Sequence, residues 1–129
     1  MAMNQEQFDR GMKLLTTMGR QNTMIKQLKE PFPDLYDISV GFLFGEVWTR
    51  PHLSLRDREL ITIAVNMALM RPTGNISHYR SAQHVGVSKE EILELILHVG
   101  MYAGWGAISP ALTQFKNVLE EDAAAEKEK

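Results

Sequence analysis

The sequence of 129 residues contains no cysteine. Disulfide bonds, thiolate metal ligands and thiol-based redox chemistry are therefore excluded. An excess of charge is lacking too, because 14 Lys and Arg residues face 16 Asp and Glu residues, for a net charge of −2. A nucleic-acid-binding protein typically has a large basic surface, so we expect no nucleic-acid partner.

Long hydrophobic runs are also missing. The most apolar stretch, LITIAVNMALM at 60–70, carries Asn66 and is shorter than the ~18 residues that a membrane-spanning helix needs. The N-terminal sequence MAMNQEQFDRGMK has no continuous apolar segment of the kind found in secretory signals. We therefore predict a cytoplasmic protein with no membrane partner.

Apolar residues recur at spacings of three and four along most of the chain, and no alternating run suggests a strand. This pattern predicts an all-α fold of about six helices. A length of 129 residues favours a single domain over 1–129, with its core at about 35–120 and a solvated tail at 121–129. The predicted helices are 4–29 with a break near Gly19, 35–48, 55–70, 76–85, 88–103 and 109–120.

Local signals set these boundaries. Prolines cannot continue a helix, short polar side chains cap helix N-termini, and glycine often follows a helix C-terminus. Ser88 with Glu91 matches the S-x-x-E capping box. The other predicted markers are Pro31 and Pro33 as stops, Asp34, Ser54 and Ser109 as N-caps, Pro110 as the first residue of the last helix, and Gly86 in a left-handed conformation.

The helices expected around 60–70 and 92–102 are apolar on nearly every face. Such helices need burial on all sides. A domain of this size has too little material to cover two of them, so we predict a homo-oligomer.

His78 and His84 lie in the stretch GNISHYRSAQHVG at 74–86. Six residues correspond to about 600° of helix rotation, which leaves the two rings ~120° apart. A metal pair on one helix needs a spacing of three or four, so we predict no metal site, and we expect His84 at the surface. Ala82 and Gly86 continue the stripe of His78, which makes His78 either a hydrogen-bonded core histidine or a group beside a pocket.

Three further polar groups stand out in apolar surroundings. Glu59 shares a stripe with Ile63 and Met67, so it is either a surface acid near a helix N-terminus or a buried carboxylate that needs a partner. His98 lies in LILHVGMYAGW, where an imidazole needs a hydrogen bond or a function. Glu46 and Arg50 flank Trp48 in FGEVWTRP with the spacing of an ordinary helix ion pair.

Two segments carry a resemblance to a known family: FGEVWTRPHLSLRDRELITIAVNMAL and HYRSAQHVGVSKEEILELILHVGMYAGW. They follow F-G-[DE]-x-W-x-R-P, R-E-L, H-x-x-x-A-x-x-x-G-[VL]-[ST]-x-[ED]-E-I and Y-A-G-[WF], in that order. The chain resembles the carboxymuconolactone decarboxylase family, within the AhpD-like superfamily, over about residues 35–120. The resemblance implies an AhpD-like helical fold that forms trimers or hexamers.

The AhpD branch has a C-x-x-C-x-x-x-H motif with a glutamate one helix upstream. By resemblance its histidine matches His78 and its glutamate matches Glu59, but the cysteine positions hold Arg71 and Gly74. A thiol peroxidase is therefore excluded. The decarboxylase branch acts on 4-carboxymuconolactone, in aromatic compound catabolism, without a cofactor. The chain departs from it at Gly106, where members commonly have proline, and at Glu59, which decarboxylases often lack.

The resemblance implies roles for the polar groups. His78 and His98 would be the general acid and the donor to the developing oxyanion, and Glu59 would set the tautomer of His78. Arg50 would hold the substrate carboxylate. The other expected substrate contacts are Glu46, Trp48, Tyr102 and Trp105. We therefore expect a cofactor-free decarboxylase, or lyase, acting on a small carboxylated lactone or similar acid. The alternative is a non-catalytic oligomeric protein that binds a small molecule on the same scaffold.

Overall fold

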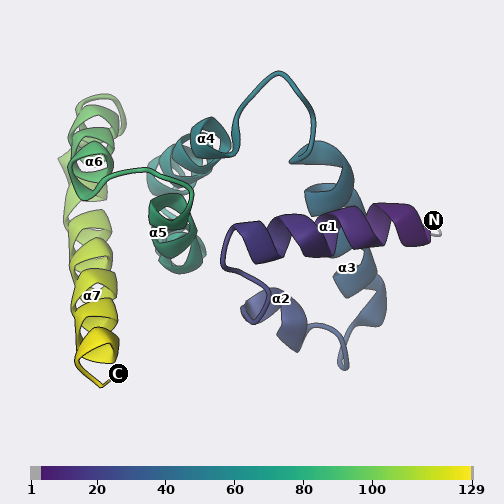
Figure 1. Cartoon of the computed structure of the whole chain (residues 1–129). Helices are drawn as coiled ribbons and strands as arrows, with labels where there is room; N and C mark the ends of the chain where they lie inside the picture. Colours follow the sequence, from purple (N-terminus) through teal and green to yellow (C-terminus); the bar gives the residue numbers. More distant parts are fainter. Residues whose placement is uncertain (1–3, 129) are drawn as a thin grey trace. The chain divides into compact units, whose positions relative to one another are not determined.

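The structure, a computed structural model, describes residues 4–128 apart from the side chains of Met24 and Pro72. All regular structure in this range is helical, which confirms the all-α prediction. The elements are α1 (Gln5–Thr17), α2 (Met24–Gln27), α3 (Pro33–Asp37), the π-helix η1 (Ile38–Val47), α4 (Leu55–Ala68), the 3₁₀ turn η2 (Pro72–Gly74), α5 (Asn75–His84), α6 (Lys89–Ala103), the 3₁₀ turn η3 (Trp105–Ala107) and α7 (Ile108–Lys127) (Figure 1).

The chain divides into two compact units, Met1–Arg58 and Glu59–Lys129. The prediction of one domain over 1–129 stays a prediction. Across residues 4–128, no helix combines the length and the apolar composition needed to cross a bilayer.

In the first unit, α1 packs directly against η1 at a pair of glycines (Figure 1). A side chain at Gly11 would overlap the carbonyl group of Val40, and one at Gly45 would overlap the carbonyl oxygen of Gln7. Because the backbones meet at these points, only glycine fits there. Leu14, Leu15, Met18, Tyr36, Val40, Phe44 and Trp48 complete the core of this unit.

The segment predicted as one α-helix at 35–48 is instead a short α-helix followed by a ten-residue π-helix. Its end is marked by the Trp48 amide, which donates to the Leu43 carbonyl five residues earlier, at 2.9 Å. Val40 and Phe44 of this π-helix are buried, and so is Trp48 directly after it. Gly45, which contacts α1, lies on the same π-helix. The apolar spacing in the sequence cannot distinguish this wider helix from an α-helix, which is why the prediction missed it.

Several predicted boundaries are confirmed. Gly19 and Gly86 have positive φ values of 70° and 96°. The Ser54 hydroxyl accepts from the Asp57 amide at 3.0 Å and caps α4. Ser88 and Glu91 form the predicted capping box at the start of α6.

Two predicted caps are wrong. Phe32, not Asp34, precedes α3, because Pro33 occupies the first helical position, where its missing N–H costs nothing. Ala107, not Ser109, precedes α7. Pro110 still falls within the first turn, so its ring breaks no intrahelical hydrogen bond.

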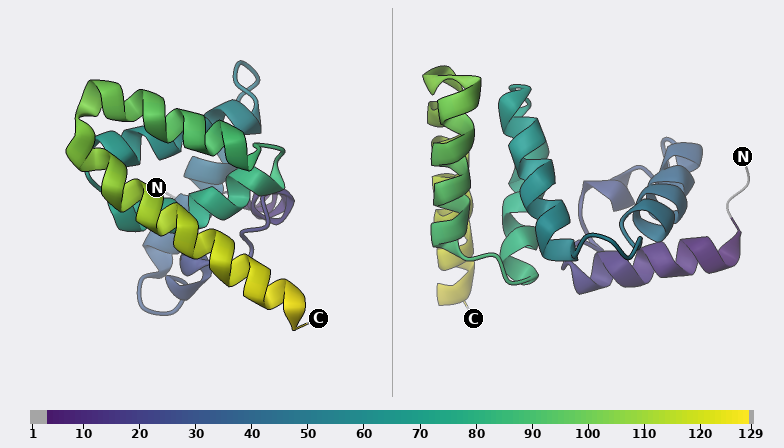
Figure 2. Two further views of the ribbon diagram at one scale, coloured as in Figure 1. Left: turned by 90° about the vertical axis from the view of Figure 1, so that its left-hand side faces the viewer. Right: turned by 90° about the horizontal axis from the view of Figure 1, so that it is seen from above.

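The second unit consists of two layers of helices, α4 with α5 and α6 with α7 (Figure 2). Their apolar faces meet in one core, in which the rings of Tyr79 and Phe115 lie 5.1 Å apart. Gly100 allows Ile108 to pack against α6, because a side chain there would overlap that isoleucine. The core residues are Ile63, Met67, Tyr79, Ala82, Val87, Ile92, Ile96, Ala107, Ala111, Phe115 and Val118.

The last helix extends beyond the predicted end near residue 120 and reaches Lys127. Its final turns are rich in alanine, the strongest helix former. Arg80 on α5 also pairs with Glu121 and Asp122. The hydrogen bond to Asp122 is the main cause that raises the pKa of Arg80. The expected solvated tail is therefore exposed but helical.

Candidate functional site

A fully buried carboxylate, Glu59, is bonded at both oxygens in the second unit. Nδ1 of His78 lies 2.9 Å from Glu59 Oε2. The Ser81 hydroxyl donates to Glu59 Oε1 at 2.7 Å. The Glu59 side chain has no exposed area, while that of His78 is 12% exposed.

The positions of these groups follow from where they lie on α4 and α5. Glu59 lies in the second turn of α4, after the Ser54 cap. His78 and Ser81 are three residues apart on α5 and so share a face. An amide pair fixes α5 against α4, because Asn75 donates to the Ile63 carbonyl at 3.1 Å and accepts from Asn66 at 3.2 Å.

The chemistry of the partners assigns the proton positions. We assign a proton to His78 Nδ1, which donates it to Glu59, because an ionised carboxylate only accepts hydrogen bonds. The second ring nitrogen, Nε2, is then the atom that can take up or release a proton. A histidine oriented by a buried carboxylate is a common arrangement for general acid–base chemistry.

His98 lies on a different side of α4 from this pair. It is exposed and contributes to two open grooves between α4 and α6; both contain Ala64, and one also contains Ala68. Ala68 follows Glu59 by nine residues, which is ~180° around α4. Within the second unit, His98 therefore does not join Glu59 and His78.

The residues of the FGEVWTRP segment belong to the first unit. Glu46 forms an ion pair with Arg10 of α1, not with Arg50. Trp48 is buried, and its ring lies 5.6 Å from that of Phe44. Arg50 is exposed, and its carbonyl accepts from the Arg58 guanidinium at 3.1 Å.

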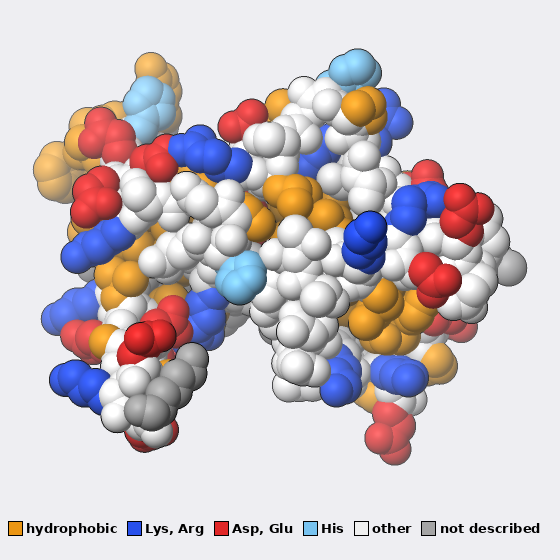
Figure 3. Space-filling model, in the orientation of Figure 1, with side chains coloured by type: hydrophobic (Ala, Val, Ile, Leu, Met, Phe, Trp, Pro, Cys, Tyr) orange, Lys and Arg blue, Asp and Glu red, His pale blue; other side chains and the backbone are white. Residues whose placement is uncertain are grey.

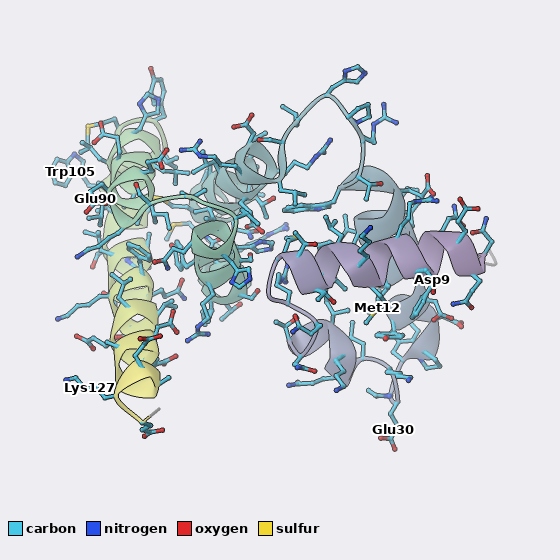
Figure 4. The ribbon with its side chains drawn as sticks, viewed as in Figure 1. Asp9, Met12, Glu30, Glu90, Trp105 and Lys127 are labelled. Atoms are coloured by element: carbon cyan, nitrogen blue, oxygen red, sulfur yellow. The ribbon has the colours of Figure 1, made fainter. Side chains whose placement is uncertain are left out.

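The two aromatic residues predicted at the substrate lie near the end of α6. Tyr102 is 85% exposed and Trp105 is 77% exposed. The Tyr102 ring is 5.2 Å from that of His98. Figure 4 shows Trp105 projecting away from the helices of the second unit.

Sequence reasoning missed two partners. Ser81 could have been identified from its spacing of three from His78, which places a second donor on the same helix face. Arg10 had no such signal, because its partner Glu46 is 36 residues away. Among the described residues, 4–128, no group of three or more His, Asp or Glu side chains could hold a metal ion.

Comparison with known proteins identifies the family. The Carboxymuconolactone decarboxylase family model matches residues 33–117. The 4-carboxymuconolactone decarboxylase of Acinetobacter baylyi is 36% identical over 123 residues, which cover 92% of each chain. An uncharacterized protein of Methanocaldococcus jannaschii is 32% identical over 98 residues, 75% of this chain and 89% of that protein.

A more limited similarity links the chain to the nitrosuccinic acid decarboxylase of Metarhizium robertsii. It amounts to 31% identity over 68 residues, 53% of this chain and 48% of that enzyme. The family match covers most of the chain, and the Acinetobacter enzyme aligns with it over almost the whole length. The chain therefore belongs to the carboxymuconolactone decarboxylase family.

Proposed function

We propose that the protein is a cofactor-free decarboxylase of a small carboxylated lactone or a similar acid, in which Glu59 and His78 transfer the proton. The observation that carries this proposal is the 2.9 Å contact between His78 Nδ1 and a fully buried Glu59 carboxylate. Two of the relatives support the reaction class, since one is named a decarboxylase of 4-carboxymuconolactone and another of nitrosuccinic acid.

The proposed reaction breaks the bond between the carboxylate carbon and its neighbour. The electron pair of that bond moves into the conjugated lactone as CO₂ leaves, which forms an enolate. His78 Nε2 then gives its proton to carbon, and the imidazole regains a proton from water. Glu59 keeps the Nδ1 proton in place, so Nε2 remains the exchanging atom. Ser81 holds the carboxylate in position.

Other residues complete the proposal. Arg50 would bind a substrate carboxylate, since a guanidinium suits bidentate pairing, with Glu46, Trp48, Tyr102 and Trp105 as further substrate contacts. His98, on the far side of α4, would reach the reacting atoms only from a neighbouring copy. By the family resemblance, the substrate would belong to aromatic compound catabolism.

We also propose that the protein is a homo-oligomer, a trimer or a hexamer by family resemblance. Large apolar side chains are exposed along α4 and α6 and gather at the end of α6 (Figure 3). Such a patch on a soluble chain is typical of an interaction surface. Its main members are Ile61, Val65, Leu69, Leu97, Met101, Tyr102 and Trp105.

The test is direct incubation of the purified protein with 4-carboxymuconolactone and related lactone acids in D₂O. We expect CO₂ release and one deuterium at the carbon that lost CO₂. His78→Ala should lower turnover by about 10²–10⁴-fold, the usual contribution of a general acid. His84→Ala is the matched control, an exposed histidine on the same helix. Equal turnover by His78→Ala would contradict the proposal. Saturable binding without turnover would instead support the non-catalytic alternative.

A further inference from the structure

A small pocket opens between the C-terminal end of α4, the start of α5 and the start of α7. Its volume is about 100 Å³. A water molecule needs only ~10–15 Å³ of such volume, and an engineered cavity of ~150 Å³ binds benzene. The pocket is therefore large enough for a molecule of a few heavy atoms. Met67, Met70 and Ala111 form much of its apolar wall.

One hydrogen-bond acceptor inside this pocket has no partner among the residues that the structure describes. Gln114 of α7 lines the pocket, and its side-chain oxygen Oε1 is buried without a hydrogen bond from any described residue. Leaving a buried polar atom unsatisfied is costly, and such atoms are normally paired. A hydrogen-bond donor placed in the pocket would satisfy this oxygen.

The guanidinium of Arg71, at the edge of the pocket, also has no partner among the described residues. Arg71 lines the pocket and is exposed. Within residues 4–128, its guanidinium has neither a hydrogen bond nor an ion pair. The adjacent Met70, which also lines the pocket, has a φ of 57°, an unfavourable left-handed conformation for this residue.

The remaining polar groups narrow the choice of ligand. The side chains of Asn66 and Asn75 are bonded to each other, and Asn75 also donates to the Ile63 carbonyl. No Asp or Glu is among the described residues that line the pocket. A ligand ammonium group would therefore lack a counter-charge and would be costly to bury. A hydroxyl group is a neutral donor that suits Gln114 Oε1.

We propose that this pocket binds a short 2-hydroxycarboxylate, with its carboxylate on Arg71 and its hydroxyl donating to Gln114 Oε1. The small alkyl part lies against Met67 and Ala111. A guanidinium is well matched to a carboxylate, and a charged hydrogen bond is stronger than a neutral one.

The site is separate from the Glu59–His78 pair. Neither Glu59 nor His78 is among the described residues that line the pocket. The inference stands whether or not the protein is a decarboxylase, because no group of the pair takes part.

The test uses the full chain and follows backbone amide signals of Ala107 and Ala111 by NMR during titration with glycolate and lactate. We expect saturable shifts at these two residues, with a millimolar dissociation constant, which is within the bounds for a ligand of this size. Acetate and propionate lack the hydroxyl and should bind about tenfold more weakly. Glycine and alanine should bind more weakly still.

Two variants locate the contacts. Arg71→Met and Gln114→Met should each weaken lactate binding by about tenfold or more, since each replaces a polar group with an apolar, unbranched side chain. Lys116→Gln, an exposed cation on α7, and His84→Gln, an exposed position on α5, should leave binding unchanged. Three results would overturn the proposal: no saturable shift at Ala107 and Ala111, equal affinity for propionate and lactate, or unchanged affinity in both pocket variants.

Discussion

The two sides of α4 place a titratable side chain in opposite environments. Toward α5, Glu59 is fully buried and both of its oxygens accept hydrogen bonds. Toward α6, His98 is exposed in open apolar grooves, and its ring lies 5.2 Å from that of Tyr102. A charge is tolerated in a protein interior only with partners of this kind. The side of α4 that faces α5 is therefore a polar site whose buried carboxylate has hydrogen-bond partners. The side that faces α6 is an exposed apolar surface of the kind that another chain covers.

The largest expected effect concerns the two histidines. On a lactone acid that the protein decarboxylates, His78→Ala should reduce kcat by about 10²–10⁴-fold, because it removes a proton donor held by a buried carboxylate. His98→Ala should reduce it less than tenfold, because His98 lies beyond α4. Steady-state kinetics on both variants, each checked for folding by circular dichroism, measure the difference. Comparable losses would show that a neighbouring copy brings His98 to the pair.

The next effect concerns stability. Glu59→Ala leaves His78 and Ser81 without their acceptor in the interior, so the free energy of unfolding should fall by about 1–3 kcal/mol for each unsatisfied group. His98→Ala should change it by no more than about 0.5 kcal/mol, as expected for a surface position. Urea unfolding followed by circular dichroism gives both values. Similar midpoints for the two variants would mean that the Glu59 network adds nothing to the fold.

The same contrast shows what the sequence could predict. The helix boundaries at Ser54, Gly86 and Ser88 follow from local capping chemistry, and the structure confirms them. Glu59 and His78 could be suspected because each interrupts an apolar stripe on its helix. Their contact could not be derived from spacing, because it joins residues 19 positions apart on different helices; only the family resemblance linked them.

Two features of the structure could not be predicted from the sequence. The π-helix at Ile38–Val47 has the apolar spacing of an α-helix, so periodicity does not reveal its wider winding. His98 has the same apolar sequence surroundings as a core histidine, yet it is exposed. Periodicity shows that a helix has apolar faces on all sides, but it does not show whether the same chain or another one covers them.

A smaller effect is expected at the exposed face of α6. Leu97 is 52% exposed, and burying such a side chain in an interface contributes about 1.5–3 kcal/mol. Leu97→Glu should therefore weaken self-association by roughly 10–100-fold. Light scattering after size-exclusion chromatography, over a range of concentrations, would show species closer to the 14.7 kDa monomer. Lys89→Glu, a charge change at an exposed position of the same helix, should leave the mass unchanged. A monomeric wild-type protein would refute the proposed oligomer.

The smallest expected effect concerns the titration of Tyr79, which lies on α5. Burial raises the pKa of the Tyr79 phenol, and a hydrogen bond with Asn75 lowers it by less. Because the neutral form is favoured in the fold, the stability contributed by Tyr79 is intact below pH ~10, the ordinary value for tyrosine. It is lost as the pH rises from there toward the raised pKa, since the unfolded chain then binds fewer protons than the folded one. Absorbance at the tyrosinate band should show one late-ionising tyrosine, absent in Tyr79→Phe and in the chain unfolded by guanidinium. If Tyr79→Phe left the alkaline titration curve unchanged in shape, the interior on this side of α4 would be far wetter than the packing around Tyr79 implies.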